Sequence, residues 1–144
     1  MKISAKAEYA CLAVFELAVR SGRQEPIRLA EIAQPNGIPE RFLVQILLQL
    51  KGPGLVTSLR GAAGGYKLAV NPAAISLWDV VHTIEGPTAE SIAQNTINTG
   101  LGWEVLREVW MEVNRHEQEY LKQTNYADLV ERAKQRDTSS MYYI

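Results

Sequence analysis

The stretch IPERFLVQILLQLKGPGLVTSLRGAAGGYKLA, residues 38–69, joins a helical pattern to a glycine-rich loop. Pro39 stands at the favoured first position of a helix, and the Gly-Pro-Gly segment 52–54 ends that helix. Two short apolar runs follow, 55–59 and 66–70, with a glycine-rich connection between them. The stretch therefore predicts a helix followed directly by a β-hairpin.

The chain before this stretch predicts two more helices. In residues 5–20 apolar side chains recur at helical spacing, and Ser4 is a candidate cap. A shorter helix over 29–33 is expected to end at the Pro-Asn-Gly segment 35–37. A short helix, a tight turn and a longer helix outline a helix-turn-helix, and a hairpin directly after it is a wing. The expected fold class is mainly α with a small β-hairpin, a winged helix-turn-helix domain plus a long dimerisation helix.

The expected wing suits contact with nucleic acid. Arg60 begins its loop and Lys67 lies on its return strand, so the hairpin presents cations to phosphates. Glycine allows the backbone to approach another molecule closely. The expected DNA contacts of the wing are Ser58, Arg60, Gly61, Gly64, Gly65, Tyr66 and Lys67.

On a helical wheel, Leu43, Ile46, Leu47 and Leu50 form the buried face of the helix before the hairpin. Arg and Gln make bidentate contacts with guanine and adenine, and aliphatic side chains can touch thymine methyl groups. The opposite face and its flanks hold Arg41, Val44, Gln45, Leu48 and Gln49, of which Leu48 and Val44 are candidates for the methyl contacts. The expected phosphate contacts are Lys2, Lys6, Arg28 and Lys51.

The second half of the chain predicts a capped helix from Ser76, a polar loop, a long helix over 103–122 and a last short helix from Asn125. The apolar face of the long helix follows a domain that can close its own core, so a homodimer is expected to cover it. The expected interface residues are Trp103, Leu106, Val109, Trp110, Val113 and Tyr120. The expected divisions are 1–86 for the DNA-binding domain, 87–102 for a loop, 103–136 for the dimerisation and C-terminal helices, and 137–144 for a tail.

Composition narrows the class of protein. No apolar run reaches the roughly 18–20 residues of a bilayer span and no signal peptide opens the chain, so a cytoplasmic protein is expected. Residues 1–68 carry nine Lys and Arg against five Asp and Glu, whereas 69–144 carry six against eleven. This split favours a function in which the basic first half binds an anion. No catalytic arrangement, metal-ligand spacing or phosphate-binding loop stands out, so enzyme activity is not expected.

The chain resembles the IscR/NsrR-type family of bacterial winged-helix regulators (the Rrf-two family). The resemblance is carried by SAKAEYACLAVFELA (4–18), by residues 29–69, by ISLWDVVHTIEGP (75–87) and by YADLVERA (126–133). It implies a homodimeric transcription regulator, usually a repressor, that binds partly palindromic operators in double-stranded DNA. By the same resemblance Arg41, Phe42, Val44 and Gln45 begin the recognition helix, and Arg60 is the arginine of the wing.

The sequence departs from this family at one place. Many members hold an iron–sulfur cluster through three cysteines in the loop before the long helix, and residues 86–102 contain none. Clusters are usually held by cysteine thiolates, so no cofactor and no metal ligand is expected. Glu8 lies where some members use a carboxylate or histidine ligand, but it has no thiolates beside it. The closer comparison is the cluster-free branch, which includes regulators controlled by a partner enzyme of cysteine synthesis.

Three functions remain open. The first is a cluster-free DNA-binding repressor whose output is set by an effector or a partner enzyme. The second is a winged-helix module that acts mainly by binding a partner protein such as a metabolic enzyme. The third is a redox or small-molecule sensor that uses Cys11 or the loop 86–102, although Cys11 lies on an apolar face typical of core thiols. His82 and His116 are interpreted as packed or solvated side chains rather than metal ligands.

Overall fold

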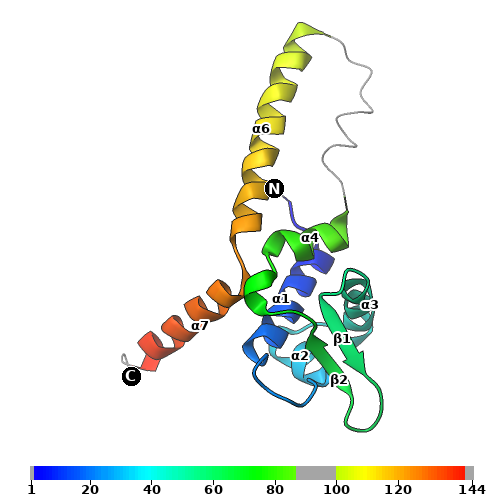
Figure 1. Ribbon diagram of the computed structural model, residues 1–144. Coiled ribbons are helices and arrows are strands. Elements are labelled where there is room, and N and C mark those ends of the chain that lie inside the picture. Colours follow the sequence, from blue (N-terminus) through cyan, green and yellow to red (C-terminus); the bar gives the residue numbers. More distant parts are fainter. Residues whose placement is uncertain (1, 87–99, 142–144) are drawn as a thin grey trace.

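The computed structural model describes residues 2–86 and 100–141. It is mainly helical with one two-stranded antiparallel hairpin, which confirms the expected fold class. Figure 1 shows α1 to α4 and the hairpin packed together, while α6 projects away from them and α7 runs off from its base. The elements are α1 (Ala5–Val19), α2 (Leu29–Asn36), α3 (Glu40–Lys51), β1 (Val56–Leu59), β2 (Gly65–Leu68), the 3-10 turn η1 (Pro72–Ala74), α4 (Leu77–Glu85), α6 (Leu101–Gln123) and α7 (Tyr126–Met141).

Polar side chains start the helices where the sequence places their caps. The Ser4 hydroxyl accepts a hydrogen bond from the Ala7 N–H at 3.1 Å and begins α1. At α4, the Ser76 hydroxyl accepts from the Asp79 N–H while the Asp79 carboxylate accepts from the Ser76 N–H. These bonds pair N–H groups that the first helical turn leaves without partners inside the helix.

The ends of α2 and α3 differ from the prediction. Pro35 does not close α2 but lies inside its last turn, and the helix ends at Gly37, which has a left-handed φ of 62°. Such a residue commonly ends a helix because its N–H turns back to carbonyls of the last turn. Pro39 is the N-cap of α3 rather than its first helical residue. These shifts leave the expected order of elements unchanged.

The core is aliphatic, and its members come from both ends of the chain. Side chains of α1, α2, α3, α4 and the hairpin pack together with Tyr126, the first residue of α7. Tyr126 is fully buried, and its hydroxyl donates to the Cys11 carbonyl at 3.0 Å. Its N–H donates to Ile75, and the Leu77 N–H donates to the Thr124 carbonyl. The sequence predicts a core closed within the first half, whereas the structure completes it with a residue that follows α6.

The long helix α6 and the last helix α7 exceed their expected bounds. α6 begins at Leu101, within the expected loop, and α7 runs to Met141 rather than ending near Arg136. Most of the expected loop lies outside the described residues, as does the end of the expected tail. Among the described residues no helix has both the length and the apolar character that a membrane span requires.

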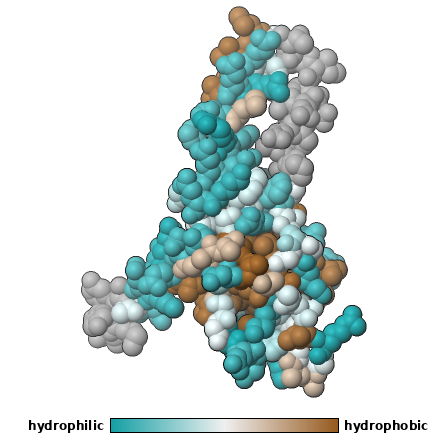
Figure 2. Space-filling model, viewed as in Figure 1, coloured by the Kyte–Doolittle hydropathy of each residue, from teal (hydrophilic) through white to brown (hydrophobic). Residues whose placement is uncertain are grey.

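Most large apolar side chains of α6 are exposed, whereas Trp103 and Leu121 are partly buried. None of its residues is buried, and Figure 2 shows apolar residues at its far end, away from the packed helices. Pairs among Leu106, Val109, Trp110, Val113 and Tyr120 are three, four or seven residues apart, so these side chains share one face of the helix. At about 1.5 Å per residue, α6 extends roughly 35 Å. We call this set of five side chains the α6 stripe.

The Tyr126 hydroxyl provides a test of the C-terminal anchor. We expect Tyr126→Phe to lower the free energy of unfolding by about 1 kcal/mol, because it removes one hydrogen bond. Tyr126→Ala should cost about 3–5 kcal/mol, since it also leaves a cavity in the core. Urea unfolding at a single protein concentration measures both values. Tyr9→Phe is the control, because the Tyr9 ring also packs against the core. Equal losses of unfolding free energy in Tyr9→Phe and Tyr126→Phe would contradict a stabilising role for the Tyr126 hydroxyl.

Candidate nucleic-acid interface

The rotational setting of α3 decides which of its side chains face outward. Leu43, Ile46, Leu47 and Leu50 are 0% exposed, which confirms the predicted buried face. The outward face carries Arg41, Val44, Gln45, Leu48 and Gln49, all exposed. The structure thus brings the predicted base-reading side chains together on one solvent-facing surface.

Phe42 lies beside this outward face at the start of α3. Its ring is partly exposed, and the Arg41 guanidinium carbon lies 5.2 Å from the ring centre. An arginine over an aromatic face is held by the charge distribution of the ring. This contact orients the guanidinium at the N-terminal end of α3.

The hairpin is held to the helices by backbone hydrogen bonds. β1 and β2 pair from Val56 with Leu68 to Leu59 with Gly65. Ile27 adds a bridge to Tyr66, with an N–H to carbonyl bond of 2.8 Å in each direction. The position of the wing therefore depends on the main chain between α1 and α2.

One side-chain bond joins the hairpin to α3. The Lys51 ammonium, in the last turn of α3, donates to the Ser58 hydroxyl on β1 at 2.8 Å. The Leu55 N–H also donates to the Leu50 carbonyl at 3.2 Å, so the turn after α3 is closed. These two bonds hold β1 against the C-terminal end of α3. Lys51 and Ser58, both predicted DNA contacts, are bonded to each other here.

The glycines of the wing have a structural role of their own. A Cβ on Gly64 would lie 2.3 Å from the Leu59 carbonyl oxygen, and one on Gly65 would lie 2.5 Å from that of Ile27. Gly61 has a φ of 107°, which side-chain-bearing residues rarely adopt. The sequence predicts that these glycines contact DNA. The structure adds that the hairpin needs at least two of them for its own close packing.

Exposed cations lie on α3, at the start of α2 and at the tip of the hairpin. Arg28 and Arg60 are exposed, and within the described residues neither guanidinium makes a hydrogen bond or a close ion pair, although the Arg28 charge helps to lower the pKa of Glu31. Lys67 differs, because its ammonium donates to the Gln24 carbonyl at 2.8 Å. Arg23 is also engaged, since it pairs with Glu31 at 2.9 Å and lowers the pKa of that carboxyl. In the part of the chain that the structure describes, Arg28, Arg41 and Arg60 therefore keep guanidinium groups without a hydrogen bond, whereas Lys51 and Lys67 each donate one.

Two predicted phosphate contacts lie elsewhere. Lys2 and Lys6 are exposed at the N-terminal end of α1, where the Ser4 N–H donates to the Glu85 carboxylate at 2.8 Å. Figure 1 shows this end of α1 on the opposite side of the packed helices from the hairpin tip. The structure does not bring these two lysines together with Arg60. They would meet DNA only at a second place on the duplex.

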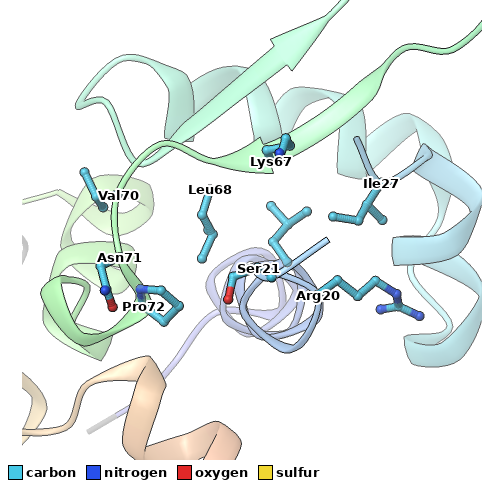
Figure 3. Close-up of a pocket in the computed structure, with 10 residues that line it drawn as sticks. Arg20, Ser21, Ile27, Lys67, Leu68, Val70, Asn71 and Pro72 are labelled. Carbon is cyan, nitrogen blue, oxygen red and sulfur yellow. The ribbon is translucent and has the colours of Figure 1, made fainter. Parts of the chain in front are cut away.

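A hollow of about 320 Å³ lies between the end of α1 and β2. Figure 3 shows Leu68 and Ser21 facing each other across it, while Arg20 extends away. Two polar groups in its wall are already engaged, because Lys67 donates to Gln24 and the Asn71 side chain accepts from Ala73. The hollow therefore presents few free polar groups to a ligand.

Cys11, His82 and His116 are the remaining candidate side chains. In residues 2–86 and 100–141 no group of three or more His, Cys, Asp and Glu side chains could hold a metal ion. Cys11, the single cysteine of the chain, is partly buried, and burial raises the pKa of its thiol. His82 stacks on Trp78 and His116 lies 3.1 Å from Glu112 on exposed α6. The donor set of this chain does not fit a cluster held by cysteine thiolates.

A helix-turn-helix with outward arginine and glutamine, followed at once by a cation-tipped hairpin, defines a winged-helix transcription regulator. Comparison with known proteins agrees with this class. The family model described as "Rrf2: Iron-dependent Transcriptional regulator" matches residues 3–132. The chain belongs to the Rrf2 family of DNA-binding transcription regulators.

Relatives of this family align with nearly the whole chain. The transcriptional regulator CymR of Bacillus subtilis is 34% identical over 144 residues, which is 100% of both chains. The solved structure of CymR, described as the global cysteine regulator of B. subtilis, has a TM-score of 0.77 at 35% identity and covers 91% of this chain and 97% of its own. The structure of T. potens IscR has a TM-score of 0.76 at 33% identity, with 92% and 88% covered.

The close approach at Gly65 gives a test of the wing's position. We expect Gly65→Ala to lower the free energy of unfolding by about 1–3 kcal/mol, because the added methyl group meets the Ile27 carbonyl. Gly22→Ala is the matched control, since its added methyl group meets nothing within 4 Å. We expect that variant to stay within about 0.5 kcal/mol of the parent. Thermal unfolding measures both variants. Equal shifts of the midpoint temperature in the two would contradict the close packing at Gly65.

Proposed function

We propose that the protein is a homodimeric repressor that binds partly palindromic DNA operators. In this proposal α3 enters the major groove and the wing tip contacts the adjacent backbone. The observation that carries it is the outward row of Arg41 and Gln45 on α3, joined through Lys51 and Ser58 to a hairpin whose Arg60 has no partner among the described residues. Arg and Gln read base edges, whereas a free arginine on a glycine-rich tip suits phosphate.

The exposed α6 stripe supports the homodimer. Five apolar side chains in a row, each about half exposed, would leave a large apolar surface in water if the chain were alone. A second copy that lays its own α6 against the stripe buries both surfaces at once, as two-fold symmetry requires. A two-fold dimer presents two copies of α3, and this matches an operator made of two related half-sites.

Repression and its release form the rest of the proposal. A dimer bound across an operator excludes other proteins from that DNA. The signal that releases it comes from an effector or a partner enzyme rather than from a cysteine-held cluster, because the chain has a single thiol. That thiol is partly buried and its pKa is raised, so less of it is in the reactive thiolate form at neutral pH. This argues against Cys11 as a redox switch.

The first test measures binding to duplex DNA at several salt concentrations. Affinity for an operator selected from a random duplex pool should fall steeply as salt rises, because phosphate contacts release counterions. Arg60→Ala should weaken binding to every duplex and reduce the slope of log affinity against log salt by about 0.9 per subunit. Arg132→Ala, on exposed α7, is the control and should leave the slope unchanged. Salt-independent binding, or identical slopes for all three proteins, would contradict the proposal.

The second test concerns the dimer. Trp110→Glu places a carboxylate in the middle of the α6 stripe, so we expect light scattering to show a shift from dimer to monomer. Met111→Glu is the matched control, because Met111 is 54% exposed against 55% for Trp110 but lies off the stripe. It should remain dimeric. A Trp110→Glu protein that stays dimeric would move the interface to another surface.

A further inference from the structure

The outward face of α3 has two kinds of side chain arranged in parallel. Val44 and Leu48, which are 45% and 66% exposed, are four residues apart and form an aliphatic row. Gln45 and Gln49, also exposed and four residues apart, form an amide row next to it. Because side chains at i and i+4 lie one above the other on a helix, each row runs along the axis of α3.

The spacing of these rows suits successive base pairs. Four residues of helix advance by about 6 Å, and successive base pairs on one strand are about 3.4 Å apart. Each row can therefore reach across about two base-pair steps when α3 lies in the major groove. Because the aliphatic row and the amide row lie side by side on α3, both would face the same base pairs.

An A·T pair presents chemistry that matches both rows. In the major groove, adenine offers the N7 acceptor and the N6 amino donor, which a glutamine amide can contact together. Its partner thymine offers a methyl group on the same groove edge, which only an apolar side chain can bury well. A G·C pair has no methyl group there. Neighbouring amide and aliphatic rows are therefore complementary to A·T pairs.

We propose that α3 reads A·T base pairs, with the Gln45–Gln49 row on adenine and the Val44–Leu48 row on thymine methyl groups. This inference rests on the proposed function, in which α3 enters the major groove. It assigns sequence preference to two aliphatic side chains that carry no hydrogen-bonding group. Arg41, at the start of the same face, remains the side chain suited to guanine.

The surroundings of the aliphatic row favour DNA over a protein partner. Arg41 precedes the row, Lys51 follows it at the end of α3, and Arg60 lies at the tip of the hairpin that Lys51 contacts. An apolar strip within a set of cations is complementary to thymine methyl groups bordered by phosphates. A protein partner would have to supply acidic groups at each of these places.

The test removes the methyl groups without changing base pairing. The duplex selected for the wild-type protein is made again with uracil in place of thymine, one position at a time in one half-site. We expect one or two positions at which uracil weakens binding about fourfold, the loss for one methyl-sized group. Leu48→Ala or Val44→Ala should bind more weakly and lose this sensitivity at its own position.

A matched variant and distinct outcomes complete the design. Val19→Ala is the control for Val44→Ala, because it makes the same change at a residue of α1 that is 48% exposed. This variant should keep the full response to uracil. Equal binding of thymine and uracil duplexes by the wild type would overturn this inference and leave DNA binding in place. A uracil response that survives in both Leu48→Ala and Val44→Ala would also overturn it. Absence of salt-dependent binding to any duplex would overturn the proposed function as well.

Discussion

Complete burial of one face of α3 is the constraint on which the rest of the interface depends. Its four aliphatic residues pack into the core with no exposed surface. Burying each such side chain is worth about 1.5–3 kcal/mol. Turning α3 by one residue would expose part of this face and bury either the ammonium of Lys51 or the amides of Gln45 and Gln49. The packing preference of Leu43, Ile46, Leu47 and Leu50 thereby determines which side chains meet a partner, although none of the four touches it.

A second set of bonds carries this orientation to the wing. The Ile27 bridge holds β2, the Lys51–Ser58 bond holds β1, and Gly65 lets the hairpin approach the main chain closely. The tip at Arg60 is left without such bonds among the described residues. A well-anchored base with a free tip allows the arginine to follow the DNA backbone while the strands stay in place. α6 has a comparable arrangement, because Tyr126 anchors the chain just after its C-terminal end while none of the residues of α6 is buried.

Local patterns predicted the elements well, and long-range contacts account for what they missed. Period-3.6 apolar spacing identifies α3 and its buried face, and the Ser76–Asp79 pair identifies the start of α4. The role of Tyr126 was missed because its partner Cys11 is 115 residues away, and no local pattern reports such a contact. Lys67 was expected at a phosphate because its charge is visible in the sequence, whereas the Gln24 carbonyl that accepts its bond is a backbone atom. The crowded side of each wing glycine is likewise a property of the folded chain.

The central claim is that α3 and the wing tip meet the same duplex. Nuclear magnetic resonance of the ¹⁵N-labelled protein, titrated with its selected operator, tests this directly. We expect the backbone amide signals of 41–49 and 60–64 to move most, while those of 20–24, Asn71, Ala73 and Ala74 stay nearly in place. Shifts confined to α1, α6 or α7, with the outward face of α3 unaffected at saturation, would contradict it.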